Sequence, residues 1–274
     1  MEILIFVILV ATAMIMEFID AGLGMGYGTV LTPLLLSFDF SPVVVVPAVL
    51  FSQAMGGTIA SIFHHRFCNV NFKPKTTNLQ KIKNGLKKYG MVDSFKRGIP
   101  KDLKVVFAIT FLGVIATVIG AFTAINIPKW LLKGYIGVIV LVIGFLLMSR
   151  KKFRFSWKKI TCVGILASFN KGISGGGFGP VTTGGQVVAG NNYKNSIGCT
   201  TLAEGPICIA GFLTYTFLNG LTNYDLITAL SIGAFLGAPL GAALTSRLNG
   251  NRIRIVLSII IILLGGWTII KLLM

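Results

Sequence analysis

The sequence predicts an all-α polytopic membrane protein with two repeated halves, and three observations support this fold class. First, 54% of the 274 residues are hydrophobic and 12% are charged, against roughly 25% charged in a soluble domain. Second, the long apolar runs lack the two-residue alternation of barrel strands, which favours membrane helices. Third, a glycine-rich stretch occurs twice, at 22–28 and at 172–179.

The formal net charge of +17 is concentrated in three segments. Of the 25 Lys and Arg residues, 20 lie at 66–104, 150–159 and 247–254. In a soluble protein such charge would suggest nucleic acid, but clusters between apolar runs are typical of cytoplasmic loops. We therefore expect a multi-pass protein of the cell membrane, with the loops 64–104 and 149–159 in the cytoplasm and no nucleic-acid partner.

Residues 1–148 are predicted to form the first membrane repeat. Apolar runs lie at 3–18, 43–63, 105–125 and 131–148, and a shorter run at 30–38 follows the first glycine stretch. Within the basic loop, apolar residues at 79, 82, 86 and 89 have helical spacing and predict an amphipathic helix on the membrane surface. His64, His65 and Cys68 at the start of this loop are interpreted as helix-end residues, because no second cluster completes a metal site.

A basic linker at 149–159 leads to residues 160–274, the predicted second membrane repeat, with apolar runs at 160–169, 196–218, 225–246 and 253–273. A shift of 151 residues places Glu204 on Gln53, and a shift of 121 places Gly241 on Gly120. The shift from Gly22 to Gly172 is 150, which suggests one inserted glycine in the second stretch. These coincidences indicate an internal duplication.

The number of crossings decides how the two halves are related. Five crossings per half would invert the halves, place both termini outside and keep the loop 247–254 in the cytoplasm, as its charge favours. If the glycine segments only dip into the membrane and return, each half has four crossings. The charge pattern favours five.

Broken helices leave backbone groups without partners, and lipid cannot satisfy them. Two half-helix N-termini that face each other would offer N–H donors and positive dipole ends to an anion near the midplane. The alternative is that the glycines only permit close helix packing. Gly22 with Gly26, and Gly237 with Gly241, fit that alternative.

Four ionisable residues fall at membrane depth: Glu17, Asp20, Lys171 and Glu204. Charged groups there are costly and mark functional candidates. Glu204 could instead be a protonated structural carboxyl, and Lys171 could contact a substrate, pair with Asp20 or reach the membrane surface. No Walker A sequence, H-E-x-x-H motif or nucleophile elbow is present, so we expect neither an enzyme nor a bound cofactor or metal.

The stretch Gly22-Leu23-Gly24-Met25-Gly26-Tyr27-Gly28, followed by Pro33-Leu34-Leu35-Leu36, carries a family resemblance. Together with the second stretch at 172–179, the duplicated halves and the basic central loop, it resembles the sulfite exporter TauE/SafE family of membrane transporters, also called TSUP. This resemblance implies export or uptake of small sulfur-containing anions such as sulfite, thiosulfate or sulfonates.

The leading hypothesis is a secondary transporter of a small anion, a sulfur oxyanion or organosulfonate, that works by alternating access. An anion channel and a non-transport intramembrane protein are the alternatives. Protons are the expected coupling ion, carried by Glu17, Asp20 or Glu204. The candidate substrate-binding residues are Gly24, Gly26, Gly28, Gln53, Lys171, Ser174, Gly175, Gly176, Gly177 and Glu204.

Overall fold

The computed structural model describes residues 2–38, 40–74, 98–124, 154–220 and 223–248, with scattered positions between 138 and 148 and between 255 and 270. Across these residues the chain is helical and forms no strand. The amphipathic helix predicted at 79–89 and most of the spans predicted at 131–148 and 253–273 lie outside the described residues.

The described part of the first half forms four helices: α1 (Ile3–Leu23), α2 (Tyr27–Ser37), α3 (Pro42–Arg66) and α5 (Lys101–Thr123). Pro42 begins α3, where the first turn does not need its missing N–H. Asp102 lies in the first turn of α5, where a carboxylate complements the helix dipole.

The second half forms α7 (Trp157–Ser174), α8 (Phe178–Val188), α9 (Tyr193–Asn219) and α10 (Tyr224–Arg247). Asparagine side chains cap two of these helices. Asn192 accepts from the Lys194 N–H at the start of α9, and Asn223 accepts from the Leu226 N–H at the start of α10, both at 3.0 Å. Such caps satisfy donors that a helix leaves unpaired at its N-terminus.

Five described helices, α1, α3, α5, α9 and α10, are long and apolar enough to cross a membrane. They expose large apolar side chains on the outside of the molecule, among them Ile3 at 84%, Phe111 at 73% and Phe217 at 86%. Exposed apolar side chains of this size and number suit lipid rather than water. The prediction of an all-α polytopic membrane protein is confirmed.

The helices form two groups, and each group takes a helix from the other half of the chain. In the first group α1, α3 and α10 run in the same direction, because residues that rise in number along one helix meet residues that rise in number along the next. The pairs in contact are Val10–Gly233, Phe18–Gly241, Glu17–Gly56 and Ala21–His64.

The second group contains α5, α7 and α9, which also run in one common direction. The pairs in contact are Ile109–Gly164, Thr117–Gly172, Gly113–Ile207 and Thr117–Gly211. Here α5 comes from the first half and accompanies two helices of the second half, just as α10 accompanies two helices of the first.

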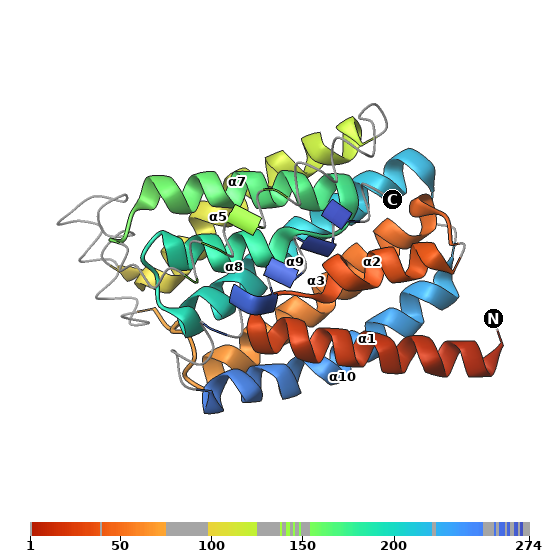
Figure 1. Ribbon diagram of the computed structural model, residues 1–274, viewed down its shortest axis with the longest axis horizontal. Helices are drawn as coiled ribbons and strands as arrows, with labels where there is room; N and C mark the ends of the chain where they lie inside the picture. Colours follow the sequence, from red (N-terminus) through yellow and green to blue (C-terminus); the bar gives the residue numbers. More distant parts are fainter. Residues whose placement is uncertain are drawn as a thin grey trace, which may run out of the picture.

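The two groups meet where α3 packs against α9 in the opposite direction. The pairs in contact are Leu50–Gly211, Gln53–Glu204, Gly57–Thr201 and His64–Gly198. In Figure 1, α1 and α10 lie side by side along the lower edge, and α7 and the yellow-green end of α5 lie along the upper edge, with α3, α8 and α9 between them. The interface between the two groups therefore lies in the middle of the molecule.

Candidate functional site

Each glycine-rich stretch breaks a helix at a glycine with a left-handed backbone. α1 ends at Gly24 and α7 ends at Gly175, with φ angles of 74° and 68°, which favour glycine. In both cases the glycine N–H bonds to the carbonyl four residues earlier. Gly26 and Gly177 then precede α2 and α8, with φ angles of 132° and 75°. The chain thus stops one helix and starts another within a few residues, twice.

Each break is shorter than its glycine-rich stretch, 22–28 or 172–179. α1 continues through Gly22, and α7 continues through Gly172 to Ser174. Each glycine in a helix interior is unfavourable by about 1 kcal/mol relative to alanine, but here tertiary packing outweighs that preference. Gly172 lies against the backbone of Thr117 on α5, and Gly22 lies against Gly241 on α10.

The predicted insertion of one glycine in the second stretch is wrong. The residues with matching backbone roles are Gly24 with Gly175 and Gly26 with Gly177, and each pair is 151 residues apart. The same spacing separates Gln53 from Glu204, which are hydrogen-bonded to each other. One constant spacing therefore relates the first three helices of each half. By this spacing Lys171 is the position equivalent to Asp20.

The two breaks pack directly against each other. Gly28 in the first turn of α2 lies against the carbonyl of Gly175. A Cβ atom on Gly176 would lie 2.7 Å from the Gly28 oxygen, and one on Gly179 would lie 2.7 Å from the Gly24 oxygen. In this conformation the glycines therefore give the close packing that was the alternative to a cavity.

Next to this crossing lies a buried polar cluster formed by Gln53 of α3, Lys171 of α7 and Glu204 of α9. The Lys171 Nζ atom donates to Glu204 Oε1 at 2.9 Å and also to Gln53 Oε1. Gln53 Nε2 donates to the same Glu204 oxygen at 2.8 Å. All three residues are at most 2% exposed, so the ion pair is held with little water and joins both helix groups.

Two further carboxyls from α1 border this cluster. Asp20 Oδ1 accepts from the Tyr27 N–H at 3.1 Å, so a carboxylate of the protein occupies the N-terminus of α2. The Glu17 carboxyl lies against Gly56 of α3, and its buried Oε2 has no partner among the described residues. Both carboxyls interact electrostatically with Lys171 and Glu204.

The cluster carries an excess of negative groups. With three carboxyls and one ammonium, the formal charge is −2 when every group is ionised. Uncompensated buried charge is strongly unfavourable. Full ionisation of all four groups in this buried cluster is therefore unfavourable.

The ten predicted substrate-site residues lie at the two breaks, in their crossing or in the polar cluster. Of the three predicted proton carriers, Glu204 belongs to the cluster, and Glu17 and Asp20 border it. The structure thus brings them together, and the binding of a substrate there stays a prediction. By position, Gly24 and Gly26 lie in the first break and Gly28 in the first turn of α2; Ser174 ends α7, and Gly175, Gly176 and Gly177 lie in the second break; Gln53, Lys171 and Glu204 form the cluster.

Sequence reasoning missed the side chains that satisfy the carbonyls at the ends of the broken helices. His64 Nε2 lies 2.9 Å from the Ala21 oxygen near the end of α1. Tyr215 donates to the Gly172 oxygen at 3.0 Å near the end of α7. His64 and Tyr215 are 151 residues apart, as are Ala21 and Gly172, so the two contacts are equivalent although the residue types differ.

Two threonines next to the breaks were also missed. Thr183 of α8 donates to the Gly24 oxygen at 2.8 Å and lies 3.0 Å from the hydroxyl of Thr200, which also accepts from Gln186. Thr32 of α2 stands 151 residues before Thr183 and lies beside Gly175, but its buried hydroxyl has no partner among the described residues. Within the described part of the chain, the threonine next to one break is therefore hydrogen-bonded in this conformation, and the equivalent threonine next to the other break is not.

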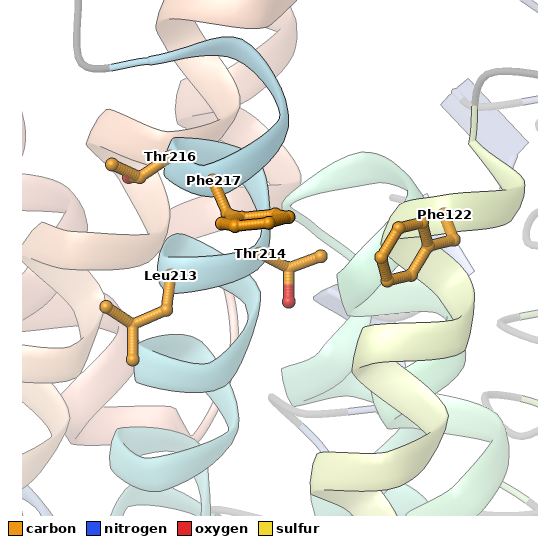
Figure 2. A pocket seen from close by; sticks show the side chains of 5 residues that line it. All are labelled: Phe122, Leu213, Thr214, Thr216 and Phe217. Carbon is orange, nitrogen blue, oxygen red and sulfur yellow. The ribbon is translucent and has the colours of Figure 1, made fainter.

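Two hollows lie away from the polar cluster. One, of about 520 Å³, is lined by Phe122 of α5 and by residues of α9, with Phe217 facing Phe122 across it (Figure 2). The other, of about 320 Å³, lies beside the end of α3 and includes His65 and Cys68. The described residues contain no group of three His, Cys, Asp or Glu side chains suited to a metal ion.

Comparison with known proteins gives two findings. The sequence profile of the sulfite exporter TauE/SafE family matches residues 9–76 and 89–268. The chain is also similar to the probable membrane transporter protein YtnM of Bacillus subtilis (strain 168). The two are 24% identical over 270 residues, which cover 93% of this chain and 79% of the relative. No solved structure matches.

Proposed function

The chain belongs to the sulfite exporter TauE/SafE family of membrane transporters, and on that premise we propose that it is a secondary transporter of a small anion. Sulfur oxyanions and organosulfonates are the first candidate substrates, because the family takes its description from sulfite export. The observation that carries the proposal is Lys171, a lysine 1% exposed at the interface of the two helix groups. A buried ammonium next to glycine backbone is suited to an oxyanion.

We further propose that the two halves are inverted repeats. The antiparallel contact of α3 with α9, the exchange of α5 and α10 between groups and the constant spacing of 151 residues support this arrangement. Inverted repeats with broken helices at their interface are common in transporters that work by alternating access. Thr183 is hydrogen-bonded at the first break, whereas the equivalent Thr32 at the second has no partner among the described residues. This asymmetry supports a protein that alternates between two conformations.

The proposed orientation in the cell membrane follows from the charge of the loops. The segments 64–104, 149–159 and 247–254 are basic and are placed in the cytoplasm, with both termini outside. α3 and α5 run in opposite directions, as this topology requires for helices joined by a cytoplasmic loop. In this topology the chain enters the membrane from the outside along α1 and returns to the outside along α2.

A thermal-shift screen of the purified protein tests the proposal. A ligand that binds only the folded state raises the apparent Tm by mass action. We expect sulfite, thiosulfate or a sulfonate to raise the Tm of the wild type but not of Lys171→Gln. Lys159→Gln is the control, since Lys159 is an exposed lysine on the same helix. Equal shifts in Lys171→Gln and Lys159→Gln would contradict binding at Lys171.

A further inference from the structure

We propose that Glu204 is an internal counterion that the substrate displaces from Lys171. In this scheme an anion binds at Lys171 Nζ only when the Glu204 carboxylate has taken up a proton, so each anion at the site is accompanied by one proton. The inference rests on the proposed function of anion transport. No bond other than the O–H bond of the Glu204 carboxylic acid forms, and that proton comes from the solution.

The hydrogen bonds of Glu204 are those that an oxyanion would use. Its Oε1 atom accepts from both Lys171 Nζ at 2.9 Å and Gln53 Nε2 at 2.8 Å. One carboxylate oxygen between an ammonium and an amide donor has the same environment as one oxygen of a bound sulfite or sulfonate. The described conformation therefore has an anion at this place already, and it belongs to the protein.

Electrostatics makes the two anions mutually exclusive. Lys171, Gln53 and Glu204 are at most 2% exposed, so charges here are weakly screened. A substrate anion next to ionised Glu204 would add a like charge to a cluster that already contains Glu17 and Asp20. Protonation of Glu204 removes this repulsion and frees the two donors for the substrate.

The other titratable groups around Glu204 do not fill this role. Asp20 of α1 is bonded to the Tyr27 N–H, and Glu17 of α1 lies against Gly56. Cys208 follows one turn later on α9 itself. α3 contributes the neutral Gln53, and α8 has no titratable residue. Among the described carboxyls, Glu204 is the one that forms an ion pair with the Lys171 ammonium, at 2.9 Å.

Asp102, the carboxyl of α5, is engaged at the far end of α9. It accepts from Asn195 at 2.7 Å. It therefore faces the start of α9 and not the site of Glu204.

The same exchange links binding to movement of the helix groups. Gln53 belongs to the group of α1, α3 and α10, whereas Lys171 and Glu204 belong to the group of α5, α7 and α9. The bond from Gln53 to Glu204 therefore crosses the interface between groups. When Glu204 leaves its two donors, this bond across the interface is lost unless the substrate replaces it.

The test measures thiosulfate binding to the purified protein by calorimetry from pH 5.5 to pH 8, because thiosulfate does not titrate in this range. With one linked proton, the Kd of the wild type should fall about tenfold per unit decrease in pH where Glu204 is ionised. Glu204→Gln should bind with a Kd that does not depend on pH. Glu2→Gln, which changes an exposed carboxyl, should behave as the wild type.

Glu204→Asp guards against a variant that merely misfolds, because it keeps a titratable carboxyl and should keep the pH slope. A wild type whose Kd is independent of pH, or a Glu204→Gln variant that retains the wild-type slope, would overturn the inference. Absence of binding and uptake for every anion tested would instead overturn the proposed function, and the inference with it.

Discussion

At the scale of single residues, the central feature is a lysine and a glutamate that neutralise each other inside a membrane protein. Lys171 and Glu204 are each 1% exposed, and Gln53 bonds to both. Removing one partner of a buried ion pair leaves the other charge uncompensated, which is more damaging than removing both. The stability of variants at this pair therefore reports whether both groups are charged.

We expect Lys171→Gln to lower the free energy of unfolding by about 3–5 kcal/mol, because Glu204 is left buried without its counterion. The double variant Lys171→Gln, Glu204→Gln should recover most of this loss. The Tm of the purified proteins in one detergent measures both effects. A double variant that is less stable than Lys171→Gln would show that the pair does not share a neutralised charge.

At the scale of helices, the crossing of the two breaks depends on glycines that admit backbone contact. A Cβ on Gly176 would lie 2.7 Å from the Gly28 oxygen, whereas one on Gly98 would meet nothing within 4 Å. We expect Gly176→Ala to destabilise the protein by about 1–3 kcal/mol through overpacking and to lower anion uptake. Gly98→Ala should change neither. Wild-type Tm and uptake in Gly176→Ala would contradict the contact.

The threonines next to the breaks give a second test at this scale. Thr183→Val leaves the Gly24 carbonyl without its 2.8 Å hydrogen bond, and an unsatisfied buried acceptor costs about 1–3 kcal/mol. Thr32→Val removes a hydroxyl that has no partner among the described residues. The Tm should fall in Thr183→Val and stay equal or rise in Thr32→Val. A Tm that falls in Thr32→Val but not in Thr183→Val would mean that the hydroxyl of Thr32, and not that of Thr183, makes the stabilising hydrogen bond.

The positions of the long helices could largely be predicted from the sequence. The apolar runs located the five long helices, although α1 ends at Leu23 rather than near residue 18. The extent of each break was overestimated, because propensity penalises Gly22 and Gly172 while their packing on other helices favours them. Which helices pair was not predictable, since α5 and α10 are exchanged between groups by tertiary contacts alone.

The sequence likewise predicted some residues of the candidate site and missed others. The cost of charge in a membrane singled out Glu17, Asp20, Lys171 and Glu204, and the structure places them together. The repeat spacing aligned Gln53 with Glu204. Thr183 and Tyr215 were missed, because their hydroxyls matter only for the carbonyls that the broken helices leave unpaired. Hydroxyl side chains in a long apolar run give no such signal by themselves.

At the scale of the whole molecule, the proposed topology predicts the side on which each loop lies. Arg252 belongs to a basic segment placed in the cytoplasm. We expect a cysteine introduced at Asn251 to resist an impermeant thiol reagent in intact cells, and one introduced at Gly220 to react. Labelling at Asn251 from outside would exclude five crossings per half and the inverted arrangement.

The most direct test of anion transport by alternating access is counterflow in proteoliposomes. Vesicles with and without internal thiosulfate are given labelled thiosulfate outside, and its entry is followed with time; sulfite is run in parallel. We predict that internal substrate accelerates entry in the wild type and that Lys171→Gln abolishes entry. Entry that is unaffected by internal substrate would indicate a channel, and no entry of either anion would contradict transport of these sulfur oxyanions.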